Sequence, residues 1–299
     1  MVQVSSSIKE KAVLLGPRRS LVGIVTPAAV PVDERSTSPA IVILNSGIIH
    51  RVGANRLSVT LARSAAAAGF AAIRFDLSGV GDSEPRGDAR TPLDAAMTDI
   101  KEALDSAAKI AGDGRFILVG LCSGADHAVV YAGTDPRVVG IAILDPSIPR
   151  TPGYFLRHYG LRLLRGASWL NVISGRHPEI RALRKRMSGD QGSIKAEGPS
   201  LESPEVRAFL ARAYSNAIKS GVRILTVLTT GSERQHNYAG QLKDAFPQVG
   251  FGDRLRTEYF RGVDHTFRSE ESRARVTRLI IAWAGLVQAS SRAAPPQLG

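Results

Sequence analysis

The sequence predicts an α/β fold, with a mostly parallel central sheet covered by helices on both faces and an inserted helical cap. Three observations predict it. Short apolar runs lack the alternation of a half-exposed strand and are typical of buried parallel strands. Amphipathic helical stretches alternate with these runs along the chain. The alternation stops over residues 146–221, where helical and loop-like stretches follow one another without a strand.

The length of the chain fits one large domain, or one domain with an inserted subdomain. It has 299 residues, of which 43% are hydrophobic. No apolar run reaches the length of a membrane span. The first residues carry no basic segment followed by an apolar core, so we expect no signal peptide. The single cysteine excludes an internal disulfide, and we expect a cytoplasmic protein.

The strands are expected in a fixed order along the chain. The first two form an antiparallel hairpin over 12–16 and 20–25, because Pro17-Arg18-Arg19 between them is typical of a turn. Apolar runs then predict the parallel strands at 40–45, 72–76, 116–120, 138–144, 224–228 and 255–260.

Helices are expected between and after these strands. The amphipathic stretches of the core cover residues 55–68, 93–111, 237–246 and 269–289. Asn55 is a candidate N-cap for the first of them, since asparagine is a favoured capping residue. The insertion has helical stretches at 154–164, 169–174, 179–187 and 204–220. We therefore divide the chain into a core (residues 1–145 and 222–289), a helical cap (146–221) and a disordered tail (290–299).

A glycine-flanked cysteine follows the third parallel strand. The sequence Gly-Leu-Cys-Ser-Gly at 120–124 lies between a strand and a helical stretch, which is the context of a nucleophile elbow. Its sharp turn requires small residues two before and two after the nucleophile. The glycines meet this requirement around Cys122, whereas Ser123 would be flanked by Leu121, which does not fit. We interpret Cys122 as the nucleophile; the alternative is a buried structural cysteine beside a glycine-rich turn.

With this elbow the chain resembles the α/β-hydrolase superfamily, in particular its serine aminopeptidase-like or exosortase-associated hydrolase branch. Three other segments are similar to loops of that family. Residues 75–84 resemble the loop after the fourth strand, 45–51 the oxyanion loop and 263–267 the histidine loop. The resemblance extends over residues 10–288 and implies the α/β-hydrolase fold. It implies hydrolytic chemistry less specifically, because a fold does not fix a substrate.

The resemblance implies that His265 is the catalytic histidine, because it follows the last strand and precedes the last helix. A thiol nucleophile needs such a base, and the base needs an acid that holds it. His127 follows the elbow closely, and we expect it to point into the structure or toward the cap. We expect His158, His177 and His236 to lie at the surface.

Two carboxylates are candidates for the acid. The resemblance places an aspartate after the strand that follows the cap, but the carboxylate at this turn is Glu233. Glutamate can orient a histidine as aspartate does, so we favour Glu233. Asp145 is the alternative, because it ends the preceding strand, a position that supplies the acid in some relatives. Asp145 could also cap the start of the inserted segment.

The resemblance also implies an oxyanion hole made of two backbone amides. One amide belongs to Ser123, and the other belongs to Gly47 or Ile48 in the loop after the first parallel strand. Asn45 and His50 of the same loop are candidates for substrate binding. His50 could instead stabilise the loop.

Positive charge is concentrated in the insertion. The net charge is +12, and residues 147–221 hold 13 arginines and lysines against 5 aspartates and glutamates. Such a patch suits acidic carriers, anionic lipid headgroups or nucleic acid, although a high-GC genome that favours arginine gives the same count. We expect no nucleic acid partner and at most weak contact of the basic cap with a membrane surface.

These features leave three functions. The first is a Cys-His-acid enzyme that cleaves a small ester, thioester or lactone through an acyl-enzyme; we expect His265 and the following helix to stabilise the Cys122 thiolate. The second is an acyltransferase that moves an acyl group from an acidic carrier protein or coenzyme A to an amine, hydroxyl or thiol. The third is a non-catalytic binding protein with a relict elbow, which the missing aspartate would explain. We expect neither a cofactor nor a metal.

Overall fold

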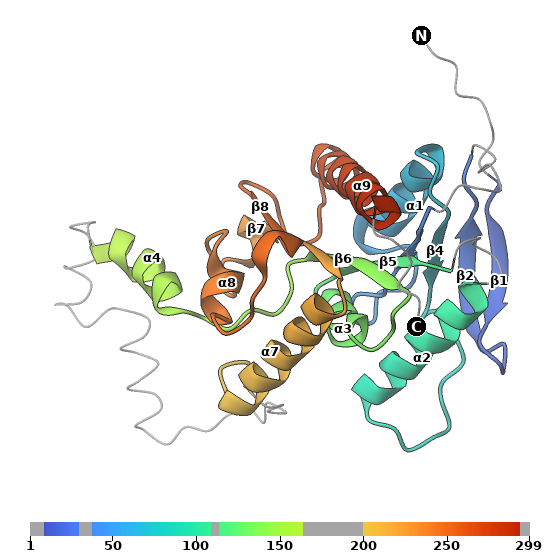
Figure 1. The fold of residues 1–299 in the computed structure, drawn as a ribbon, viewed down its shortest axis with the longest axis horizontal. Coiled ribbons are helices and arrows are strands. Elements are labelled where there is room, and N and C mark those ends of the chain that lie inside the picture. Colours follow the sequence, from blue (N-terminus) through green and yellow to red (C-terminus); the bar gives the residue numbers. More distant parts are fainter. Residues whose placement is uncertain (1–8, 30–37, 109–113, 164–199, 294–299) are drawn as a thin grey trace, which may run out of the picture.

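The computed structural model describes residues 9–29, 38–108, 114–163 and 200–293. Its centre is a single sheet in the order β1-β2-β4-β3-β5-β6-β7-β8 (Figure 1). The pairs β1–β2 and β2–β4 are antiparallel, and the remaining pairs are parallel. The strands are β1 (Lys11–Leu15), β2 (Leu21–Thr26), β3 (Ala40–Ile43), β4 (Ala72–Phe75), β5 (Phe116–Leu121), β6 (Val138–Leu144), β7 (Arg223–Thr229) and β8 (Leu255–Phe260). The predicted hairpin and mostly parallel sheet are confirmed.

Helices cover both faces of this sheet, as predicted (Figure 1). On one face lie α1 (Leu57–Ala67) and α9 (Glu270–Ala293), and on the other lie α2 (Pro92–Ala107), α3 (Ser123–Ala132) and α7 (Pro204–Lys219). Beyond β6 and β7 lie α4 (Pro152–Leu163) and α8 (Gln241–Ala245). Short 3-10 turns are η1 (Ala54–Arg56), η2 (Thr230–Ser232) and η3 (Gly252–Arg254).

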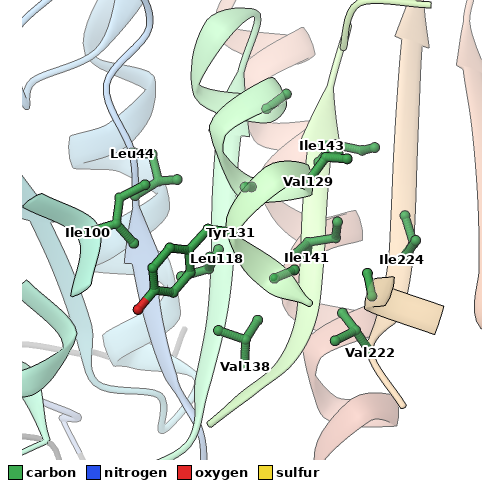
Figure 2. Close-up of a cluster of buried hydrophobic side chains, with 14 of the residues drawn as sticks. Leu44, Ile100, Leu118, Val129, Tyr131, Val138, Ile141, Ile143, Val222 and Ile224 are labelled. Carbon is green, nitrogen blue, oxygen red and sulfur yellow. The ribbon is translucent and has the colours of Figure 1, made fainter. Parts of the chain in front are cut away.

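Two apolar clusters hold these layers together because neighbouring strand residues point to opposite faces. In β3, Ile41 belongs to the cluster under α1 and α9, whereas Val42 belongs to the cluster under α2, α3 and α7. Figure 2 shows part of the second cluster, where Val129 and Tyr131 of α3 pack over Leu118 and Ile141. Both faces of the central strands are therefore buried, which explains their continuous apolar runs.

The insertion is organised differently from the predicted cap. Helix α7 packs along α3 and adds the fully buried Tyr214 to the core, so this helix belongs to the layer that covers the sheet. The predicted stretches 169–174 and 179–187 lie outside the described residues. At the C-terminus α9 continues to Ala293, past the predicted start of a disordered tail at residue 290.

The entry to α1 also departs from the prediction. Asn55 has a positive φ of 50° within η1, and its side chain donates to the Thr266 carbonyl oxygen at 3.0 Å. The N-cap of α1 is Arg56, which makes no side-chain capping bond. Asn55 therefore ties η1 to the loop that carries His265 instead of capping a helix. Within the described ranges, no helix is long and apolar enough to cross a membrane.

Candidate active site

Cys122 occupies the sharp turn between β5 and α3. Its backbone has φ 53° and ψ −122°, a conformation that non-glycine residues rarely adopt and that marks a constrained functional position. A Cβ atom on Gly120 would collide with the backbone of Gly124, and one on Gly124 would collide with the Asn45 carbonyl oxygen. The chain therefore turns at Cys122 in the register that the glycine spacing predicts. The thiol is partly exposed at the N-terminus of α3.

His265 lies next to this thiol and next to a buried carboxylate. Its Nδ1 is 2.8 Å from Asp145 Oδ2 and 2.9 Å from Ser232 Oγ. Hydrogen bonds to Asp145 and to Cys122 raise the pKa of His265 to about 10, against the opposing effect of burial. Because Nδ1 faces Asp145, Nε2 is the ring nitrogen left to exchange a proton with the thiol.

Asp145 follows β6 and is surrounded by donors. Its carboxylate accepts from the Thr229 amide at 2.7 Å, the Thr229 hydroxyl at 2.7 Å and the Ser232 hydroxyl at 3.0 Å. Burial alone would raise its pKa, but hydrogen bonds from His236, His265 and Thr229 hold the pKa of Asp145 well below its usual range. A fully buried, ionised carboxylate is therefore fixed against His265.

The loop after β3 lies beside the elbow, where the sequence predicts the oxyanion hole. The Gly47 amide donates to Ser123 Oγ at 2.7 Å, so this loop lies directly against the start of α3. Ser123 is the first residue of α3, where a backbone amide has no acceptor within the helix. Ile48 next to Gly47 is 93% exposed. The Gly47 amide thus lies against the residue that follows Cys122, and the oxyanion hole stays a prediction.

Comparison with known proteins agrees with this architecture. Residues 48–285 match the profile of the Alpha/beta hydrolase family. The chain belongs to this family.

Solved structures of low sequence identity share the fold of this α/β hydrolase. A thermostable carboxyl esterase from Bacillus coagulans has a TM-score of 0.57 and 13% identity, and the match covers 94% of this chain and 100% of the esterase. Proline iminopeptidase from Mycobacterium smegmatis has a TM-score of 0.55 at 14% identity, with 95% and 100% of the two chains covered. DcsB, in complex with its substrate analogue, has a TM-score of 0.55 at 15% identity, with 92% and 99% covered. No curated protein matches the sequence.

The acid contact in this hydrolase differs from the favoured prediction. Glu233 has an exposed side chain at the end of η2, and no hydrogen bond joins its carboxylate to His265 in the part of the chain that the structure describes. Asp145, the alternative, makes that contact. The reason is that η2 turns the Ser232 hydroxyl inward, toward Asp145 and His265, and leaves the next side chain in solvent. The preference for Glu233 is therefore wrong.

The prediction also misplaced His236. We expected a surface residue, but the side chain is fully buried and its Nε2 lies 3.2 Å from Asp145 Oδ1. Asp145 is thus approached by two histidines, one at each carboxylate oxygen. The polar sequence around residue 236 carries no signal for this burial, which depends on packing between distant segments. His177 lies outside the described residues.

Asn45 and His50 have different surroundings in the loop after β3. Asn45 is 4% exposed, and its side chain donates to the Ile49 carbonyl oxygen and accepts from the Leu77 amide. These bonds hold the loop in place; Asn45 also lines a cavity beside this loop, and its role in substrate binding stays a prediction. His50 is exposed and lines a small, mainly apolar cavity between this loop and α1.

A second, open cavity lies beside His265. It has a volume of about 460 Å³ and is lined by His265 and residues 230–235. The base of the insertion holds these residues, because the Tyr154 hydroxyl donates to the carbonyl oxygens of Glu233 and Arg234 at 3.1 and 3.2 Å. Within the described ranges, no group of three or more histidine, cysteine or carboxylate side chains is arranged to bind a metal ion.

Proposed function

We propose that this α/β hydrolase uses Cys122, His265 and Asp145 to cleave a small ester, thioester or lactone through a covalent acyl-enzyme. The observation that carries the proposal is the position of Cys122 at the elbow, beside a histidine that is hydrogen-bonded to a buried aspartate. These are the three roles of a nucleophile, a base and the group that orients the base. The resemblance to the serine aminopeptidase-like or exosortase-associated branch stays a prediction.

The chemistry follows from the protonation of the pair. His265 takes the thiol proton, and the thiolate attacks the acyl carbon to give a tetrahedral intermediate. The amides of Ser123 and of Gly47 or Ile48 stabilise its oxyanion. Collapse breaks the bond to the leaving group, which receives the proton from His265 and departs as an alcohol or thiol. Water then attacks the thioester with His265 as base, which releases the acid and restores the thiol.

Asp145 contributes by keeping the imidazole in one tautomer and by stabilising its positive form. Its interactions with His236, His265 and Thr229 keep it ionised in a site where burial alone would raise the pKa of the carboxylate. This arrangement removes the main argument for a relict elbow, which was the lack of an acid partner for His265.

Acyl transfer is the second candidate function. A cysteine nucleophile gives a thioester acyl-enzyme, which reacts readily with amines and thiols. Water therefore competes less effectively with these acceptors than it would at a serine site. The concentration of arginine and lysine in residues 147–221 favours an acidic donor, such as an acyl carrier protein or coenzyme A. In this version the second step replaces water by the acceptor nucleophile and uses the same residues.

Intact mass spectrometry tests the proposal. The protein is incubated with a p-nitrophenyl ester or an acyl thioester, and we expect the mass of one acyl group to be added at Cys122. Cys122→Ala should gain no mass, and His265→Ala should be acylated roughly 10²–10⁴-fold more slowly. The absence of both adduct and turnover would rule out the two enzyme functions. An adduct that persists in water but is discharged by an amine or a carrier thiol would favour transfer.

A further inference from the structure

His236 is a fully buried histidine whose place in the fold the proposed chemistry does not yet use. It follows η2, and its amide donates to the Ser232 carbonyl oxygen at 3.1 Å. The next residues attach the segment to its surroundings, because Asn237 Nδ2 donates to the Tyr154 carbonyl oxygen and Gln241 Nε2 donates to that of Gln235. The imidazole is therefore held by a backbone that is fixed on both sides.

The polar atoms of this ring have few partners. Burying an imidazole without hydrogen bonds is unfavourable, so a buried histidine normally has a partner for each ring nitrogen. Here neither nitrogen has a well-aligned partner among the described residues. The closest charged group is Asp145, with Oδ1 at 3.2 Å from Nε2. Among the described residues, Asp145 is therefore the polar group that interacts with the His236 ring.

The contacts of Asp145 are divided between its two oxygens. Oδ1 accepts from the Thr229 amide and faces His236. Oδ2 accepts from the hydroxyls of Thr229 and Ser232 and faces His265. A group that occupies Oδ1 prevents the carboxylate from rotating and leaves Oδ2 directed at His265.

We propose that His236 is a positioning residue, which holds Asp145 through Oδ1 and thereby orients His265 for reaction with Cys122. The inference rests on the proposed function and extends it to the residue behind the acid. His236 does not reach the reacting atoms; it acts through Asp145, much as an outer partner orients a ligand that binds the reacting group. In this role Nε2 carries the hydrogen and Nδ1 does not.

Two substitutions of similar size separate this role from simple packing. Glutamine can place a side-chain N–H near the position of Nε2, whereas methionine fills the space without a donor. The measured quantity is the rate of Cys122 alkylation by iodoacetamide, because it reports the reactivity of the thiol whatever the acyl substrate is. We expect His236→Met to slow alkylation by about 10-fold or more and His236→Gln to stay within about 3-fold of the native rate. The matched control is His127→Met, at a half-buried histidine of α3, and this variant should be alkylated at the native rate.

Equal alkylation rates in native protein, His236→Met and His236→Gln would overturn the inference. Should the methionine variant fail to fold, ¹⁵N chemical shifts of the native protein decide: an Nε2–H tautomer at His236 supports the inference, and an Nδ1–H tautomer overturns it. The proposed function fails separately. If alkylation depends on His236 as expected but no ester or thioester acylates Cys122, the positioning role stands and the acyl chemistry is wrong.

Discussion

The Nδ1 atom of His265 lies 2.8 Å from Oδ2 of Asp145, although 120 residues separate the two in the sequence. They meet because β6 and β8 flank β7 in the sheet and all three are parallel, so that their carboxyl ends lie at the same edge. The turn after β7 completes the contact, since Ser232 donates to Asp145 and lies against the same ring nitrogen of His265. Asp145 and His265 are therefore positioned by three neighbouring strand ends.

Asp145→Asn should remove the charge that stabilises protonated His265 and allow the wrong tautomer. We expect kcat for a p-nitrophenyl ester to fall on the order of 10³–10⁴-fold. Glu233→Gln should leave kcat close to the native value, because that side chain points into solvent. A half-buried control is Asp126→Asn on α3, whose carboxylate accepts from Ser147 and makes no contact with His265 among the described residues. A large loss in Glu233→Gln, with Asp145→Asn active, would contradict the assignment.

The sequence predicts some parts of this site because local sterics determine them. The elbow needs small residues at 120 and 124 for steric reasons that do not depend on distant segments. The continuous apolar runs predict strands that are buried on both faces of the sheet. The choice between Asp145 and Glu233 was not local. Both follow strands that end at the same edge of the sheet, and only the direction of η2 decides which one reaches His265.

Burial of polar residues was equally hard to predict. His236 lies in a polar stretch, yet its side chain is fully buried and its Nε2 lies 3.2 Å from Asp145 Oδ1. The burial of Asn45 was also not predicted. Its side chain is hydrogen-bonded to the backbone of Ile49 and Leu77. Helix α7 was assigned to the cap since it lies within the insertion, whereas its apolar face packs on α3. In each case the decisive contact is long-range.

The stability of the protein should depend on pH through His265. Its pKa is about 10 in the folded protein, against about 6.5 in an unfolded chain. A group whose pKa is raised by folding stabilises the fold fully below the unfolded value and loses this contribution as the pH rises through the folded value. The difference in urea midpoint between native protein and His265→Ala should therefore shrink from about pH 6.5 to about pH 10. A difference that stays constant over this range would contradict the ion pair with Asp145.

Gly120→Ala should be destabilising, because the added methyl group would meet the backbone of Gly124 across the elbow. Neither backbone can move without distorting β5 or α3, so we expect a loss of about 1–3 kcal/mol or more in the free energy of unfolding. The matched control is Gly285→Ala in α9, where an added Cβ meets no other atom within 4 Å. That change should stabilise the protein by about 0.5–1 kcal/mol, since alanine favours a helix. Urea unfolding measures the change in the free energy of unfolding for each variant. Equal changes in Gly120→Ala and Gly285→Ala would contradict the close packing of the elbow.

Ser123→Ala tests which groups form the oxyanion hole. The Gly47 amide donates to Ser123 Oγ, so the hydroxyl occupies one of the amides that we propose for the oxyanion hole. Removing the hydroxyl frees this amide and keeps the backbone amide of residue 123. We therefore expect kcat/KM for a p-nitrophenyl ester to stay at the native value or rise by up to about 3-fold. A fall of about 10²–10³-fold, the usual effect of losing one oxyanion donor, would show instead that the Ser123 hydroxyl itself donates to the oxyanion. The accompanying change in the loop can be followed by the amide resonance of Gly47, which should shift in Ser123→Ala and not in His127→Met.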